Sequence, residues 1–245
     1  MVRAMKPLEH STIESLKQQR LVWSASHSYS PLQGLYYLAS GYAELDQALG
    51  GWPASGLVEL QIERMGIGEL RLLLPALAAL TKGEHAHKLQ VWLDAPSQLM
   101  PQGLGGAFSD QLVVLNEPKH ELKLWALEQL FRSGACSAVV FWVKALKPAQ
   151  AKRLQIAAKE SNTLGFMLSY SSAQSVSLPI SLRMELSASL NGLMLNVFKR
   201  QNAFPLAPFE VNFQQHFPEL FERTTRPAIH AYQHNVLAFP NSSNS

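Results

Sequence analysis

The chain has 245 residues, of which 47% are apolar and 16% charged, with a formal net charge of +3. This size and apolar content predict one large packed domain, and the low charge indicates a surface used for contacts. The single cysteine, Cys136, excludes a disulfide framework and a metal-thiolate set. We expect no membrane span, because no run approaches ~18 consecutive apolar residues, and no signal peptide, because the first residues contain no apolar run. We therefore expect a cytoplasmic protein with no membrane contact.

Predicted helices and strands alternate through the first two thirds of the chain. A polar helix is expected over 11–19, and a short helix containing Leu45 and Leu49 ends at Gly50-Gly51. Alternation of strands and longer helices predicts an α/β domain whose sheet is mostly parallel and flanked by helices. The predicted strands are 57–62, 89–93, 111–115, 138–143 and 164–168, and the predicted helices are 68–80, 119–132 and 148–162.

The last third of the chain has a different pattern. Two strands, 182–186 and 193–198, flank Asn191-Gly192, which predicts a C-terminal β-hairpin with a tight turn. Scattered aromatic residues and prolines follow, then a polar end that we expect to be mobile or ordered by a partner. The predicted organisation is an N-terminal helix and linker (1–35), an α/β domain (36–213) and an extended tail (214–245).

The segment between the first long strand and the next helix lies where a phosphate-binding loop is expected. Such a loop has the pattern Gly-x4-Gly-Lys-Ser/Thr, whose amides, lysine and hydroxyl bind phosphates and magnesium. Here Glu63 replaces the first glycine, Glu69 the lysine and Leu70 the hydroxyl residue, while Gly66 and Gly68 remain. Because carboxylates repel a triphosphate, we expect no nucleotide cofactor.

Three alternatives remain for this degenerate loop. It is a former nucleotide pocket reused as a contact surface, or its glycines only form a strand–helix turn. In the second case Glu63 and Glu69 are ordinary acids that stabilise the helix dipole. The third alternative is residual nucleotide binding by the helix N-terminus.

The order of three short motifs resembles the RecA ATPase core. We call the first the pre-loop motif: Leu45-Asp46-x2-Leu49-Gly50-Gly51-x-Pro53-x2-Gly56-x2-Glu59. The others are Asp94-Ala95 and Arg132-Ser133-Gly134-Ala135. When the chain is aligned with the RecA core on these motifs, Trp142 occupies the position of the Walker B aspartate and Pro96 the position of the catalytic glutamate. The resemblance therefore implies a protein with a RecA-like fold that has no ATPase activity and is not an enzyme.

Within the RecA superfamily the chain is most similar to the SulA/ImuA group, over roughly residues 15–213. Trp23 and the pair Lys199-Arg200 fit the ImuA pattern. The longer segments that resemble ImuA are 66–80, 124–129, 132–136 and 153–158, and the segment 157–167 also resembles SulA. SulA is shorter and lacks the pre-loop motif. After Leu168 both relatives tend to have Arg-Pro, where this chain has Ser169-Tyr170.

The ImuA resemblance implies an accessory protein of the SOS response to DNA damage. Such a protein would act as an adaptor in mutagenic translesion synthesis, binding RecA, an ImuB-type Y-family polymerase relative, and its own copies. The alternative is a SulA-like cell-division inhibitor that binds FtsZ. A cryptic magnesium-dependent ATPase is the third hypothesis.

Two basic groups are candidates for partner contacts. Lys147, Lys152 and Arg153 lie at or in one predicted helix, where they form either a solvated face or a patch for DNA phosphates or an acidic partner. Lys199 and Arg200 follow a hairpin strand, and either protect a sheet edge or contact RecA or DNA.

Aromatic residues near the C-terminus form a third candidate. Phe213, Phe217, Leu220 and Phe221 have the spacing of an amphipathic helix, which docks in a partner's groove or packs back on its own domain. His85 and His87 are expected in a solvated loop, so no metal site is predicted.

Overall fold

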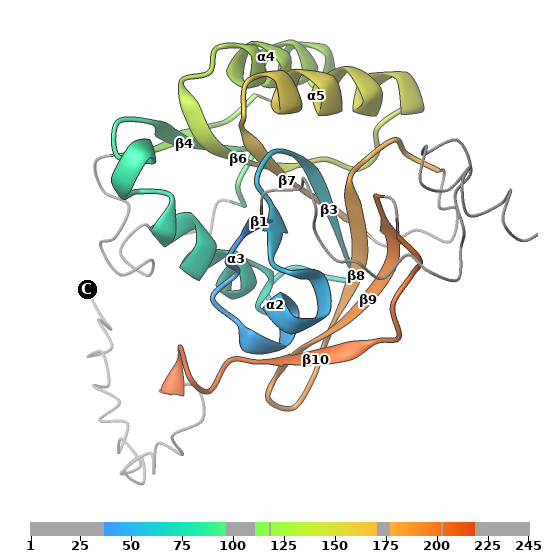
Figure 1. The fold of residues 1–245 in the computed structure, drawn as a ribbon. Coiled ribbons are helices and arrows are strands. Elements are labelled where there is room, and N and C mark those ends of the chain that lie inside the picture. Colours follow the sequence, from blue (N-terminus) through green and yellow to red (C-terminus); the bar gives the residue numbers. More distant parts are fainter. Residues whose placement is uncertain (1–36, 97–110, 118, 171–176, 202, 219–245) are drawn as a thin grey trace, which may run out of the picture.

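The computed structural model describes residues 37–96, 111–117, 119–170, 177–201 and 203–218 (Figure 1). The predicted helix 11–19, Trp23, and the candidates Leu220 and Phe221 lie outside these residues. The proposed division at residues 35 and 213 is not tested by the described part of the chain.

The described residues form one eight-stranded sheet and a small two-stranded sheet. The large sheet has the order β10-β9-β8-β3-β7-β6-β4-β5, with parallel pairing from β8 to β5 and antiparallel pairing of β8, β9 and β10. Its strands are β3 (Gly56–Ile62), β4 (Leu89–Leu93), β5 (Leu112–Leu115), β6 (Cys136–Trp142), β7 (Leu164–Tyr170), β8 (Leu182–Ala188), β9 (Gly192–Arg200) and β10 (Phe209–Asn212). The small sheet pairs β1 (Tyr37–Leu38) with β2 (Trp52–Pro53).

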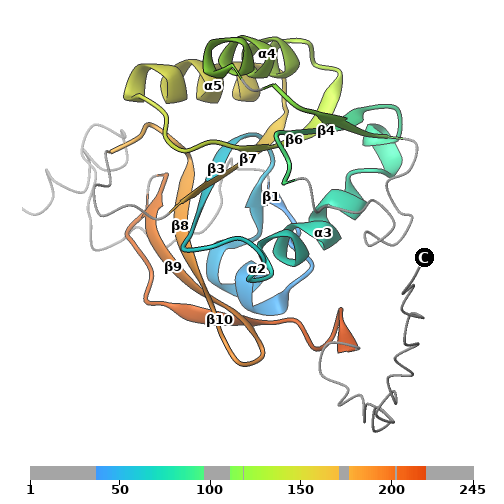
Figure 2. The same ribbon diagram turned by 180° about the vertical axis from the view of Figure 1, so that it is seen from behind.

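Helices cover both faces of the large sheet (Figures 1 and 2). On one face lie α2 (Ala43–Leu49) and α3 (Glu69–Ala79), and on the other α4 (His120–Arg132) and α5 (Pro148–Glu160). A 3₁₀ turn, Gly83–His85, follows α3. The central strand β3 shows why two cores form: Val58 and Leu60 pack toward α2 and α3, while Leu57 packs toward α4 and α5.

The α/β prediction is confirmed, with a mixed and mostly parallel sheet. Each predicted strand and helix from Leu45 to Leu186 that falls in the described residues is found, with ends displaced by a few residues. The apolar run before Val143 forms β6, every residue of which is buried, as expected of a central parallel strand. The RecA-like assignment stays a prediction.

The C-terminal prediction needs two corrections. The strand β10 (Phe209–Asn212) was not predicted, and it adds an edge strand to β9. The hairpin turn is also displaced by one residue from Asn191-Gly192: Ser189 N–H donates to Gly192 O (3.1 Å), which leaves Leu190, 91% exposed, and Asn191 between the bonded residues. Gly192 is needed for a different reason, since a Cβ there would lie 2.1 Å from Val211 O of β10.

Candidate functional site

The degenerate loop joins β3 to α3 at the carboxyl end of the parallel strands, where open α/β sheets usually bind ligands. Gly66 (φ +82°) and Gly68 (φ +111°) both have left-handed backbone angles, which glycine adopts without steric cost. Their N–H groups have the position in the chain that phosphate-binding amides occupy in an intact loop. The glycines therefore keep the turn of such a loop although the flanking chemistry has changed.

The carboxylate of Glu69 binds these loop amides from within the protein. Gly66 N–H donates to Oε1 (3.0 Å) and Gly68 N–H donates to Oε2 (3.1 Å). Glu69 is 5% exposed, whereas Glu63 is exposed and makes no such contact. A carboxylate that accepts two N–H bonds at a helix N-terminus is a stable arrangement, because the donors and the helix dipole both favour negative charge. A phosphate would have to displace this internal anion.

Aromatic residues close the loop from the C-terminal side. A Cβ on Gly68 would lie 2.7 Å from Cε2 of Phe213, whose side chain is 3% exposed. The Phe213 ring packs against Tyr42 (centroids 5.6 Å apart) and Phe217 (6.1 Å). Tyr42 is held in turn, since its hydroxyl donates to Arg71 O (2.8 Å).

The C-terminal aromatic prediction is thus corrected for its described half. Residues 214–216 form a turn rather than a continuing helix. Phe213 and Phe217 pack back on the domain, one of the two alternatives that the sequence left open. Burial also raises the pKa of the Tyr42 hydroxyl, with smaller effects of Arg71 and Glu44. The role of Tyr42 has no signal in the sequence beyond its place next to the pre-loop helix.

The two other positions of the ATPase pattern hold no carboxylate. Trp142 ends β6 and is 6% exposed, packed against Trp92 of β4 with ring centroids 6.1 Å apart. Pro96 is half-buried after β4. The nearby Asp94 is engaged elsewhere: it accepts from Glu117 N–H (2.7 Å) and forms an ion pair with Lys123. An indole ring therefore occupies the position that the resemblance assigns to the Walker B carboxylate.

A buried ion pair joins two neighbouring strands of the large sheet, and one of these strands, β3, leads into the degenerate loop. Glu59 of β3 pairs with Arg183 of β8, and each side chain is 4% exposed. Ser169 of β7 donates its hydroxyl to the same carboxylate (3.0 Å). The cation that pairs with Glu59 comes from the neighbouring strand β8. Glu59 was predicted only as part of the pre-loop motif, and its partner Arg183 was missed.

The basic candidates are spread over the surface and do not converge. Lys147 and Lys152 are exposed at the start of α5, while Arg153 pairs with Glu128 of α4. Lys199 donates to Leu178 O, and burial, with the charge of Arg183, lowers the pKa of its ammonium. Arg200 donates through Nε to Phe204 O (2.8 Å). Their function stays a prediction.

The described part of the chain was also searched for a metal site, a reactive thiol and a membrane-spanning helix. No group of three or more His, Cys, Asp or Glu side chains there is arranged to hold a metal ion. Cys136 is 1% exposed and burial raises the pKa of its thiol, which disfavours the reactive thiolate. None of the helices in these residues is long and apolar enough for a membrane span.

Replacing Glu69 with alanine is expected to lower the free energy of unfolding by about 2 kcal/mol, because two charge-assisted hydrogen bonds are lost and the buried Gly68 N–H is left without its acceptor. Urea unfolding followed by tryptophan fluorescence measures the change. The control is Glu63→Ala in the same loop, which should stay within about 0.5 kcal/mol of the original chain because Glu63 is exposed. Equal effects of the two substitutions would contradict the assigned contacts.

Comparison with known proteins finds a partial similarity to SulA. No protein-family model matches it. Over 100 residues it is 33% identical to the cell division inhibitor SulA of Photorhabdus laumondii, a match that covers 40% of this chain and 55% of that protein. The chain thus spans about half the length of the curated relative it matches. A crystal structure of SulA from Pseudomonas aeruginosa aligns with a TM-score of 0.39 and 20% identity, over 46% of this chain and 98% of that one. A TM-score this low does not establish a shared fold, so the sequence match is the firmer likeness: part of this chain is similar to SulA.

Proposed function

We propose that this chain is a non-catalytic regulator that inhibits cell division by binding FtsZ, as part of the SOS response in the cytoplasm. The observation that carries the proposal is the 33% identity to the cell division inhibitor SulA. This similarity favours the alternative drawn from the sequence over the translesion adaptor.

The loop geometry supports the non-catalytic part of the proposal. Glu69 binds the amides that would receive phosphate, Trp142 stands at the Walker B position and Pro96 at the catalytic glutamate. A nucleotide would have to displace a buried carboxylate and still find no acidic ligand for its magnesium at those two positions. Under this proposal the α/β domain serves as a scaffold for protein contacts.

The translesion adaptor remains the second candidate because of the pre-loop motif. SulA lacks this motif, whereas here it forms α2, a turn with left-handed Gly50 and Gly51, and the beginning of β3. The sequence match to SulA also leaves more than half of this chain unmatched. Under this candidate the partners are RecA and an ImuB-type protein, with DNA contact and self-association as further parts of the same hypothesis.

A pull-down with the purified chain separates the two candidates. FtsZ, RecA and the ImuB-type protein of the same cell are offered together, with and without ATP. The division-inhibitor proposal predicts capture of FtsZ in both conditions. Capture of RecA or the ImuB-type protein without FtsZ would overturn it in favour of the adaptor. Capture of FtsZ that requires ATP would contradict the expectation that the degenerate loop binds no nucleotide.

A further inference from the structure

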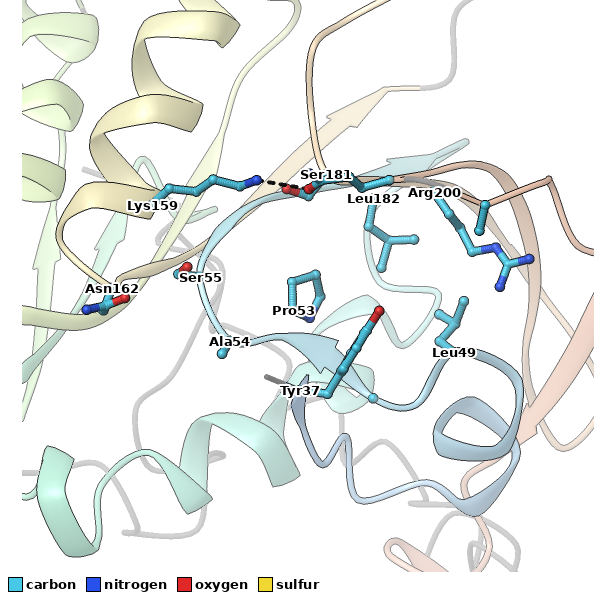
Figure 3. Close-up of a pocket in the computed structure, with 13 residues that line it drawn as sticks. Tyr37, Leu49, Pro53, Ala54, Ser55, Lys159, Asn162, Ser181, Leu182 and Arg200 are labelled. Carbon is cyan, nitrogen blue, oxygen red and sulfur yellow. Dashed lines mark hydrogen bonds between the residues drawn. The ribbon is translucent and has the colours of Figure 1, made fainter. Parts of the chain in front are cut away.

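A cavity of about 360 Å³ lies at the opposite end of β3 from the degenerate loop. Its walls come from β1, α2, the segment before β3, the end of α5, the beginning of β8 and the end of β9 (Figure 3). The seven residues of β3 place it about 20 Å from the loop, at a rise of about 3.3 Å per residue. Its volume lies within the range of ligand-binding pockets.

The middle of the cavity is apolar. Figure 3 shows Pro53, Leu182 and the ring of Tyr37 between two basic side chains, with Leu49 below one of them. These side chains come from four separate elements: β1, α2, β2 and β8. An apolar surface of this kind accommodates an aliphatic or aromatic side chain and releases water on binding.

Two cations stand on either side of this apolar surface (Figure 3). Lys159 Nζ donates to Gln201 Oε1 (2.9 Å), and Arg200 Nε donates to Phe204 O (2.8 Å). Neither takes part in the ion pairs found within the described residues. No Asp or Glu is among the described residues that line the cavity. Both cations thus have neutral partners, and Arg200 keeps its two Nη groups for a carboxylate.

We propose that this cavity binds an acidic peptide segment of a partner protein. An apolar side chain of the peptide lies on Pro53, Leu182 and Tyr37, while carboxylates on either side pair with Lys159 and Arg200. A nucleic acid fits less well, because its affinity comes from many phosphate contacts along an open, basic groove. Here only two cations lie on either side of an apolar surface. The proposal goes beyond FtsZ binding and does not depend on it, since a synthetic peptide tests it.

The probe is the fluorescein-labelled peptide Asp-Glu-Phe-Leu-Glu-Asp, measured by fluorescence polarisation with the full chain. Two further probes carry the same label: Lys-Lys-Phe-Leu-Lys-Lys and a hexathymidylate. Lys159→Ala and Arg200→Ala are each expected to weaken binding of the acidic peptide about tenfold, as loss of a charge-assisted contact at a partly open site implies. The double variant Lys159→Glu/Arg200→Glu should lose the acidic peptide and gain the basic one.

The matched control is Lys82→Glu, which reverses an exposed charge after α3 that does not line the cavity. It should leave the affinity for the acidic peptide unchanged within about twofold. Failure of the acidic peptide to bind, or equal binding by the double variant, would overturn the proposal. Binding of hexathymidylate alone, with the same dependence on Lys159 and Arg200, would replace it with a nucleic-acid site. The single alanine variants keep the test decisive if the double variant does not fold.

Discussion

Arg183→Ala is expected to lower the free energy of unfolding by about 3–5 kcal/mol, the cost of leaving a buried charge without its partner. Glu59 and Arg183 are each 4% exposed, so water cannot replace the lost guanidinium. The Ser169 hydroxyl still donates to Glu59 but carries no charge. The substitution also removes the guanidinium that lies 5.1 Å from the centroid of the Phe198 ring. Urea unfolding at neutral pH, followed by tryptophan fluorescence, measures the effect.

Two controls separate the buried charge from general damage. Arg132→Ala removes an arginine that is 62% exposed in its pair with Glu128, and should cost about 1 kcal/mol or less. The double variant Glu59→Leu/Arg183→Leu should recover much of the stability that Arg183→Ala loses, because no charge is then left buried. If Arg183→Ala costs no more than Arg132→Ala, the pair does not have the assigned role.

Phe213→Ala is expected to lower the free energy of unfolding by about 3–5 kcal/mol, the usual range for removing a buried phenylalanine. Phe213 is 3% exposed and contacts Gly68, Tyr42 and Phe217. Its loss should open the degenerate loop as well as weaken the core. Native-state hydrogen exchange of the Gly68 amide is therefore expected to accelerate more than that of the β6 amides.

The control for Phe213 is Phe204→Ala, since Phe204 is 61% exposed and should change stability by no more than about 0.5 kcal/mol. Should Phe213→Ala also cost less than about 1 kcal/mol, the segment after β10 would not cover the loop. In that case the aromatic residues would be free for a partner, as the amphipathic-helix hypothesis holds.

The parallel part of the fold was predictable because its elements have strong local signals. The continuous apolar run of β6 and the helical spacing in α4 leave little ambiguity. β10 was missed since its sequence, Phe-Glu-Val-Asn, is short and lies among prolines and aromatics, and only its pairing with β9 makes it a strand. The hairpin turn was misjudged because Gly192 serves close packing against Val211 rather than a left-handed turn.

The loss of the phosphate site stays a prediction, and the contacts within the degenerate loop were not predictable from the sequence. A glutamate in place of the loop lysine signals a lost phosphate site from sequence alone. That Glu69 turns back to bind Gly66 and Gly68 depends on backbone geometry that no local pattern contains. The pairing of Glu59 with Arg183 joins residues 124 positions apart. The cavity lined by Lys159 and Arg200 is formed by residues of six elements: β1, α2, β2, α5, β8 and β9. Contacts between residues so far apart in the chain depend on the order of the strands in the sheet, which local sequence spacing does not reveal.

Sedimentation of FtsZ polymers in GTP with increasing amounts of the purified chain tests the proposed function most directly. The account predicts that polymer mass falls in proportion to the chain added, and that added ATP changes nothing because Glu69 holds the loop amides. Undiminished FtsZ polymer at excess chain would contradict division inhibition. Inhibition that appears only with ATP would contradict the expectation that the degenerate loop binds no nucleotide.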